Sequence, residues 1–130
     1  MRQTPLLEFE SSAFEVVPGE DEETNPGIYG KSLADWLGEQ LRSAGYSTRE
    51  IIAEDFGWLV PVASARCSLY VACASMEADK WMVFVFAEGG WLSRLLGRDK
   101  RAESVASLYA AVRRCLEGAP IIQCLREEAV

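Results

Sequence analysis

The stretch KWMVFVFAE, residues 80–88, decides the fold of this chain. Successive residues of a strand point to opposite faces, and between its charged ends this stretch is apolar at odd-numbered and even-numbered positions alike. A strand that is apolar on both faces is typically central in its sheet, with another layer of structure packed against it. Residues 77–79 form a turn before it and Gly89-Gly90 ends it. We therefore expect a sheet built around this strand.

Three further strands are predicted on its N-terminal side. Residues 67–75 alternate regularly, and residues 58–63 form a second strand, in which Pro61 favours an edge position or a bulge. Residues 6–17 alternate imperfectly and predict an opening strand, whereas residues 48–55 fit either a short strand or a connecting turn. The expected core positions are Cys67, Leu69, Val71 and Cys73 in residues 67–75, and Phe14, Val16 and Val17 in the opening strand.

Two amphipathic helices are predicted, over residues 31–44 and 99–117. Apolar residues recur in each at spacings of three and four, as on the buried face of a helix. Gly45 after the first helix, and Gly118 with Pro120 after the second, are typical of helix ends. The expected buried stripes are Leu33, Trp36, Leu37, Leu41 and Ala44 in the first helix, and Ala102, Val105, Ala106, Tyr109, Val112 and Leu116 in the second.

The expected element order is β-α-β-β-β-α, followed by a short closing strand at Ile121, Ile122 and Cys124 and then a polar tail. Consecutive strands joined by short turns favour an antiparallel β-meander, and two amphipathic helices would cover one face of it. The predicted fold class is therefore α+β, a two-layer sandwich. The 130 residues are expected to form a single domain with flexible ends at residues 1–5 and 126–130.

Acidic residues gather near the start of the chain. The formal net charge is −7, and residues 1–25 contain seven acidic residues against one basic residue, Arg2. Non-specific nucleic-acid binding needs clustered Lys and Arg, so no nucleic-acid partner is expected. The longest apolar run, residues 81–87, is far shorter than the ~20 residues of a membrane-spanning helix. Without an apolar signal-peptide core in its first residues, the chain is expected to be cytoplasmic and to make no membrane contact.

Residue types that many catalytic and metal sites require are missing from the sequence. The absence of histidine excludes Ser-His-Asp and Cys-His catalytic arrangements. Cys67, Cys73, Cys115 and Cys124 show no C-x-x-C spacing, and we expect free, buried thiols rather than a zinc site. No metal and no cofactor are expected, and any catalysis would depend on carboxylates, cysteine or lysine.

Two motifs resemble known elements of phosphate chemistry. NPGIYGKS, residues 25–32, differs by one residue from the phosphate-binding pattern G-x-x-x-x-G-K-[ST]. Because Pro26 removes a backbone donor and acidic residues precede the motif, we interpret it as a turn and a helix start with Ser32 at the cap. EDFGW, residues 54–58, contains a D-F-G triplet without the other kinase motifs. We interpret it as a bend entering a strand, with an acid–base or metal role for Glu54 and Asp55 as the alternative.

Two surface segments are candidates for partner binding. The consecutive acids at residues 20–23 lack the alternating spacing of a calcium loop. They form either a solvated loop or an electrostatic docking site for a basic partner. Residues 91–101 combine apolar residues with four basic ones. They form either a short helix on the core or an exposed apolar patch with a basic rim, suited to a partner protein or a second copy of the chain.

Three segments carry a resemblance: PGEDEETNPGIYG at residues 18–30, LADWL at residues 33–37, and EDFGW at residues 54–58. With them the chain resembles a group of small uncharacterised bacterial cytoplasmic proteins over residues 13–75. The resemblance implies a compact single domain and implies no activity. By analogy, it also suggests that the acidic turn and residues 54–58 share one site.

We expect a non-catalytic binding protein of the adaptor, inhibitor or immunity-like type. The alternatives are an acidic secretion-chaperone-like dimer, joined through Trp91–Leu96, and a carboxylate-dependent enzyme. Such chaperones typically begin with a helix, whereas this chain is predicted to begin with a strand. Reversing the charges at residues 20–23 is expected to weaken partner capture and to leave thermal stability nearly unchanged. The candidate binding residues are Glu20, Asp21, Glu22, Glu23, Tyr29, Glu54, Asp55, Trp91 and Leu95.

Overall fold

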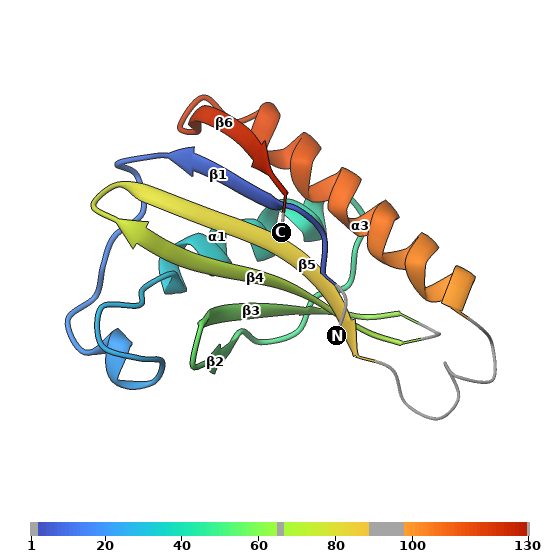
Figure 1. Ribbon diagram of the computed structural model, residues 1–130, viewed down its shortest axis with the longest axis horizontal. Helices are drawn as coiled ribbons and strands as arrows, with labels where there is room; N and C mark the ends of the chain where they lie inside the picture. The colour runs from blue at the N-terminus through green and yellow to red at the C-terminus, as the bar shows by residue number, and fades with distance from the viewer. Residues whose placement is uncertain (1–2, 65–66, 89–97, 130) are drawn as a thin grey trace.

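A computed structural model describes residues 3–64, 67–88 and 98–129 of the chain. Within them, six strands form one antiparallel sheet in the order β2-β3-β4-β5-β1-β6, and two helices pack on one face of it (Figure 1). The predicted α+β fold is confirmed, with the element order β-α-β-β-β-β-α-β. The elements are β1 Leu6–Glu10, the 3-10 turn η1 Glu20–Glu22, α1 Lys31–Ser43, β2 Ile52–Glu54, β3 Gly57–Val62, β4 Ser68–Glu77, β5 Lys80–Glu88, α3 Arg98–Glu117 and β6 Gln123–Glu128.

The strand predicted to be central is β5, which lies between β4 and β1. On its helix-facing side, Val83 and Val85 are fully buried in the main core. On the other side, Phe84 and Phe86 belong to a second apolar cluster, together with residues of β3 and β4. Both faces of β5 are therefore apolar and buried, as its sequence predicts.

The first strand lies earlier in the sequence than expected. The alternation within β1 already supplies an inward apolar face, and β1 pairs with both β5 and β6. The chain leaves the sheet at Ser11, whose N–H donates to the carbonyl of Asp79 at 2.9 Å. Val16 and Val17 lie beyond this point and are 47% and 48% exposed, so their assignment to a strand core is wrong. Phe14 is buried, but it packs on two tryptophan rings from outside the strand.

The edge strands are β2 and β6, so the edge position predicted for the strand containing Pro61, β3, is wrong. Pro61 pairs with Tyr70 of β4 on one side. On the other side, the ladder with β2 stops at the Ile52–Leu59 pair, and the Pro61 carbonyl accepts the N–H of Arg49 at 2.9 Å. The N–H that proline lacks therefore falls where strand pairing is already interrupted, a position at which a sheet tolerates proline.

α1 follows the predicted helix closely. Leu33, Leu37 and Leu41 are fully buried against the sheet, where α1 packs on β3 and β4. Gly45, just after the helix, has φ of +97°, the left-handed conformation that commonly closes a helix. This packing places the start of α1 beside the ends of β3 and β4, where the candidate site is found.

α3 covers the sheet mainly with its C-terminal half. Its fully or nearly fully buried side chains are Leu108, Ala111, Val112 and Leu116. Ala102 and Ala106, which the sequence assigned to the buried stripe, are exposed. The expected stripe is therefore correct only toward the end of the helix.

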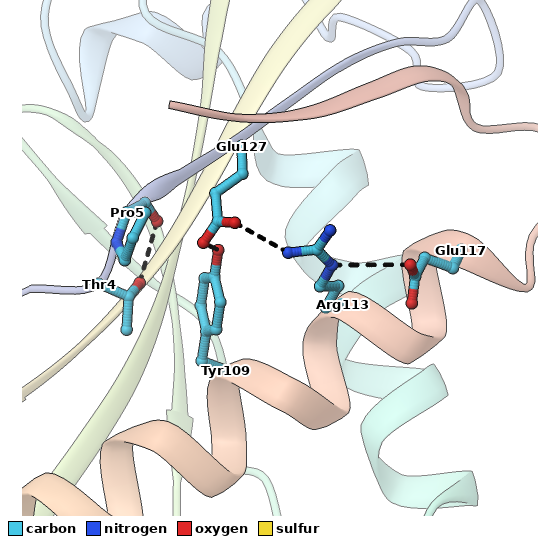
Figure 2. Close-up of polar contacts among 6 residues, drawn as sticks. All are labelled: Thr4, Pro5, Tyr109, Arg113, Glu117 and Glu127. Carbon is cyan, nitrogen blue, oxygen red and sulfur yellow. Dashed lines mark hydrogen bonds and ion pairs between the residues drawn. The ribbon is translucent and has the colours of Figure 1, made fainter. Parts of the chain in front are cut away.

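The last strand is longer than expected and is tied to α3 by side chains. β6 continues to Glu128, where the sequence suggested a polar tail. The Tyr109 hydroxyl donates to Glu127 Oε1 at 2.6 Å, and Arg113 Nη1 donates to Glu127 Oε2 at 3.0 Å (Figure 2). Burial and the bond to Glu127 raise the pKa of Tyr109 to about 12, and the same two hydrogen bonds lower the pKa of Glu127. These contacts hold the end of the chain on the helix.

All four cysteines are free. Cys73 is fully buried, and desolvation raises the pKa of its thiol. Cys124 is exposed, so the expectation that the thiols are buried is wrong at this position. Among the described helices, none combines the length and the apolar composition needed to cross a bilayer.

Candidate functional site

The acidic segment Glu20–Glu23 is not uniformly solvated, because its first carboxylate is buried. Glu20 begins η1 and is 3% exposed. Its Oε1 accepts the N–H of Val17 at 2.8 Å. Its Oε2 accepts the N–H groups of Gly30 and Lys31 at 3.2 and 3.1 Å. Both oxygens of Glu20 are therefore used inside the protein and do not form part of an exposed acidic face.

These contacts place a negative charge at the start of α1. The first N–H groups of a helix have no partner within the helix, and the helix dipole favours a carboxylate near them. Gly30 is the N-cap residue and has no side chain that could serve. The carboxylate of Glu20 takes this role, whereas Ser32 lies inside the helix. The prediction of Ser32 as the cap is therefore wrong.

Asp21 also stabilises the first acidic loop. Its Oδ2 accepts the N–H of Gly27 at 2.9 Å. Its negative charge, together with burial, raises the pKa of the Tyr29 hydroxyl. The backbone of Tyr29 forms two hydrogen bonds with Ser75 at the end of β4. The Tyr29 N–H donates to Ser75 Oγ at 3.0 Å, and the Ser75 N–H donates to the Tyr29 carbonyl at 2.8 Å. Tyr29 is half-buried against the core, so only part of its ring is available to a partner.

The second acidic loop is the turn between β2 and β3. Glu54, Asp55 and Phe56 are all exposed there. The ring of Phe56 stacks on Phe84, with 6.1 Å between the ring centroids. The side-chain amide of Asn25, in the first loop, donates to the carbonyl oxygen of Asp55 at 3.0 Å. This hydrogen bond joins the two acidic loops directly.

Both loops also pack on the same backbone group, the carbonyl of Cys73 in β4. A Cβ atom added at Gly30 would lie 2.5 Å from this oxygen, and one added at Gly57 would lie at the same distance. Both glycines have φ of +153°, a region of backbone space that is essentially restricted to glycine. The start of α1 and the β2–β3 turn therefore approach one point of β4 so closely that only glycine fits.

We call the exposed carboxylates of the two loops, Glu22, Glu23, Glu54 and Asp55, the acidic face. Phe56, 39% exposed, lies in the same turn as two of them. The structure thus brings together the two acidic segments that the sequence singled out, with Tyr29 between η1 and α1. Trp91 and Leu95 lie outside the described residues. Sequence reasoning missed the roles of Glu20, Asn25 and Phe56, because no local pattern marks a contact between residues this far apart.

A groove of about 330 Å³ lies elsewhere on the molecule, between α1 and residues 48–51. Arg42 Nη1 donates to Thr48 Oγ1 at 2.6 Å, linking α1 to this segment. A smaller hollow of about 120 Å³ lies at the β3–β4 end of the sheet. The residues lining the groove are Lys31, Ala34, Asp35, Gly38, Arg42, Thr48, Arg49, Glu50, Ile51 and Val60. No local sequence pattern groups these residues.

The acidic face presents negative charge at the surface of the molecule. Glu54 and Asp55 are exposed, and they line neither the groove nor the smaller hollow. Acid–base catalysis needs further polar groups within hydrogen-bond reach around a bound substrate. Over residues 3–64, 67–88 and 98–129, no three carboxylate, thiol or imidazole groups gather as the ligands of a metal ion would. What the two loops form is an exposed, negatively charged surface of defined shape.

No protein-family model matches the chain, and neither a curated protein sequence nor a solved structure was found that is similar to it. Function is therefore inferred from the geometry of the acidic face and of the groove.

Proposed function

We propose that this chain is a non-catalytic binding protein that holds a basic surface of another protein on its acidic face. The observation that carries the proposal is the hydrogen bond between Asn25 and Asp55, because it joins two exposed acidic loops into one surface. Four exposed carboxylates there complement Lys and Arg side chains of a partner, which favours rapid and selective association. Adaptor, inhibitor and immunity-like roles are functions of this kind.

Two features of the acidic face favour a protein partner. The loops are held by internal hydrogen bonds that Glu20 and Asp21 accept and that Asn25 donates, so binding does not have to order them. Phe56 adds an exposed aromatic ring beside the carboxylates. Protein interfaces commonly combine an aromatic centre with a polar rim.

The experiment compares two double charge-reversal variants. Glu54→Lys with Asp55→Lys alters the acidic face. Glu39→Lys with Glu103→Lys makes the same change of net charge at exposed positions of α1 and α3. The wild-type protein is used to capture a partner from cell extract, and the association rate of the purified partner is then measured with each variant.

We expect the acidic-face variant to lower the association rate by about tenfold or more and to weaken its dependence on salt. The control variant should stay within about a factor of two of the wild type, since its charges lie away from the interface. Equal losses in both variants, or none in either, would contradict the proposal. Glu20 is left unchanged in this test because its carboxylate holds the loop.

A further inference from the structure

Three positively charged side chains line the groove beside α1 and form no ion pair among the described residues. They are Lys31, Arg42 and Arg49. In the part of the chain that the structure describes, the ion pairs are formed by other cations, on β5, α3 and β6. The chain carries 20 acidic against 13 basic side chains, so a carboxylate partner is available in excess. Three cations against two carboxylates, Asp35 and Glu50, leave the lining of this groove with a net positive charge, which places it to bind an anion.

Arg42 is positioned for this role by its neighbours. Its Nη1 donates to Thr48 Oγ1 at 2.6 Å, which orients the guanidinium across the groove. A guanidinium has five N–H donors in a fixed plane, so this bond leaves others for a ligand. Gly38, one turn earlier in α1, supplies the space, because a Cβ atom there would lie 3.3 Å from Arg42 Nη1.

The groove is large enough to admit a small molecule. A volume of about 330 Å³ lies at the lower end of the range for ligand pockets. Arg42 comes from the helix wall and Arg49 from the opposite wall, and guanidinium groups recognise carboxylate and phosphate oxygens through paired hydrogen bonds. Lys31 adds a third positive charge; its Nζ lies 5.3 Å from the centre of the Trp58 ring.

We propose that this groove binds a small molecule through its carboxylate or phosphate group. Asp35 and Glu50 also line the groove, so a ligand that carries only negative charge meets some repulsion. A ligand with hydroxyl or amino groups beside its anionic group would satisfy both sets of side chains. This site is separate from the acidic face, and its ligand class does not depend on the partner proposed there.

The test uses inorganic phosphate and acetate as probes of the two anionic groups. Backbone ¹H–¹⁵N spectra of the full chain are recorded during titration with sodium phosphate or sodium acetate, and with sodium chloride at matched ionic strength. We expect saturable shifts of the amides of residues 38–51 with at least one oxyanion. Shifts that are spread over the surface, or that chloride reproduces, would overturn the proposal.

Variants assign the effect to the groove. Arg42→Gln and Arg49→Gln should each weaken oxyanion binding by about tenfold, as expected when a charge-assisted hydrogen bond is lost. Arg114→Gln, at an exposed position of α3, should leave the binding unchanged. Gly38→Ala should change binding less than either arginine variant, since the guanidinium of Arg42 can move by a few tenths of an ångström to admit the new Cβ. Undiminished binding in both Arg42→Gln and Arg49→Gln, or equal weakening in Arg114→Gln, would overturn the assignment.

Discussion

Replacing the buried Glu20 with alanine should destabilise the protein far more than any other substitution in the acidic segment. The carboxylate accepts three backbone N–H groups, two of them at the start of α1. Hydrogen bonds to a charged group contribute about 1.5–3 kcal/mol each, and loss of a helix cap costs about 0.5–2 kcal/mol. Water can replace some of these hydrogen bonds in the variant, so the loss should be smaller than the sum of the separate contributions. We expect a loss of about 3–5 kcal/mol in the free energy of unfolding. That is a large fraction of the ~5–15 kcal/mol that stabilises a typical domain.

The assay is urea unfolding followed by tryptophan fluorescence, with far-UV circular dichroism as a second probe. We expect the midpoint to fall while the m-value stays constant, as for a change in stability alone. Glu22→Ala is the matched control, since Glu22 is exposed, and it should change stability by no more than about 0.5 kcal/mol. Glu20→Gln should fall between the two, because glutamine keeps one acceptor oxygen.

A loss below about 1 kcal/mol for Glu20→Ala, or a loss equal to that of Glu22→Ala, would refute the capping role, since even a typical helix cap contributes about that much. The burial of Glu20 changes one expectation drawn from the sequence. Reversing all four charges at residues 20–23 would place an ammonium group against three N–H donors. We now expect such a variant to lose stability, and a binding test should alter only the exposed carboxylates.

Three further predictions concern the two loops and the last strand. Gly57→Ala should lower the free energy of unfolding in urea by about 3 kcal/mol or more, because its Cβ would overlap the Cys73 carbonyl. The control Gly27→Ala, whose Cβ would meet nothing within 4 Å, should cost about 1 kcal/mol for backbone strain alone. Equal costs would contradict the shared packing. Hydrogen bonds from α3 lower the pKa of Glu127, so this carboxylate should stabilise the fold above the usual carboxyl pKa of about 4.3 and lose that contribution as the pH falls through its lowered value. Glu127→Gln should therefore flatten the acid side of the thermal-stability profile, and an unchanged profile would exclude the link. Phe56→Ser should lose about 1–2 kcal/mol of stability, because the ring stacks on Phe84, but should stay folded and weaken capture of the basic partner. Full binding by this variant would remove Phe56 from the interface.

The predictable parts of the fold are the elements in which apolar residues recur regularly along the whole helix or strand. α1, β4 and β5 each carry enough regular apolar positions to define both their type and their buried face. β1 was placed wrongly because Val16 and Val17 are as good a local strand signal as Leu6–Glu10. The choice between them depends on which residues pair with β5, and β5 comes after β2, β3 and β4 in the sequence. The face of α3 was only half correct because its first turns extend past the buried core.

The candidate site was predictable as a pair of acidic segments, and not as a structure. Sequence patterns treat the four acids at residues 20–23 alike, whereas burial separates Glu20 from its neighbours. The hydrogen bond from Asn25 and the shared contact with the Cys73 carbonyl join segments that are distant along the chain. The groove combines a helix face with an edge segment, so its charges are scattered in the sequence and no motif reveals them.

The position of β1 has a consequence for how the chain is made. β1 is synthesised before the other strands, but it lies between β5 and β6, the last two strands of the chain. Strands β2 to β5 can pair with their sequence neighbours as they leave the ribosome, whereas β1 must wait for both of its partners. Contacts between residues so distant in sequence form slowly, because the intervening loop must be closed first. Until residues 123–128 have been synthesised, the growing sheet keeps an open edge at β1, and during that interval it is exposed to pairing with the wrong chain.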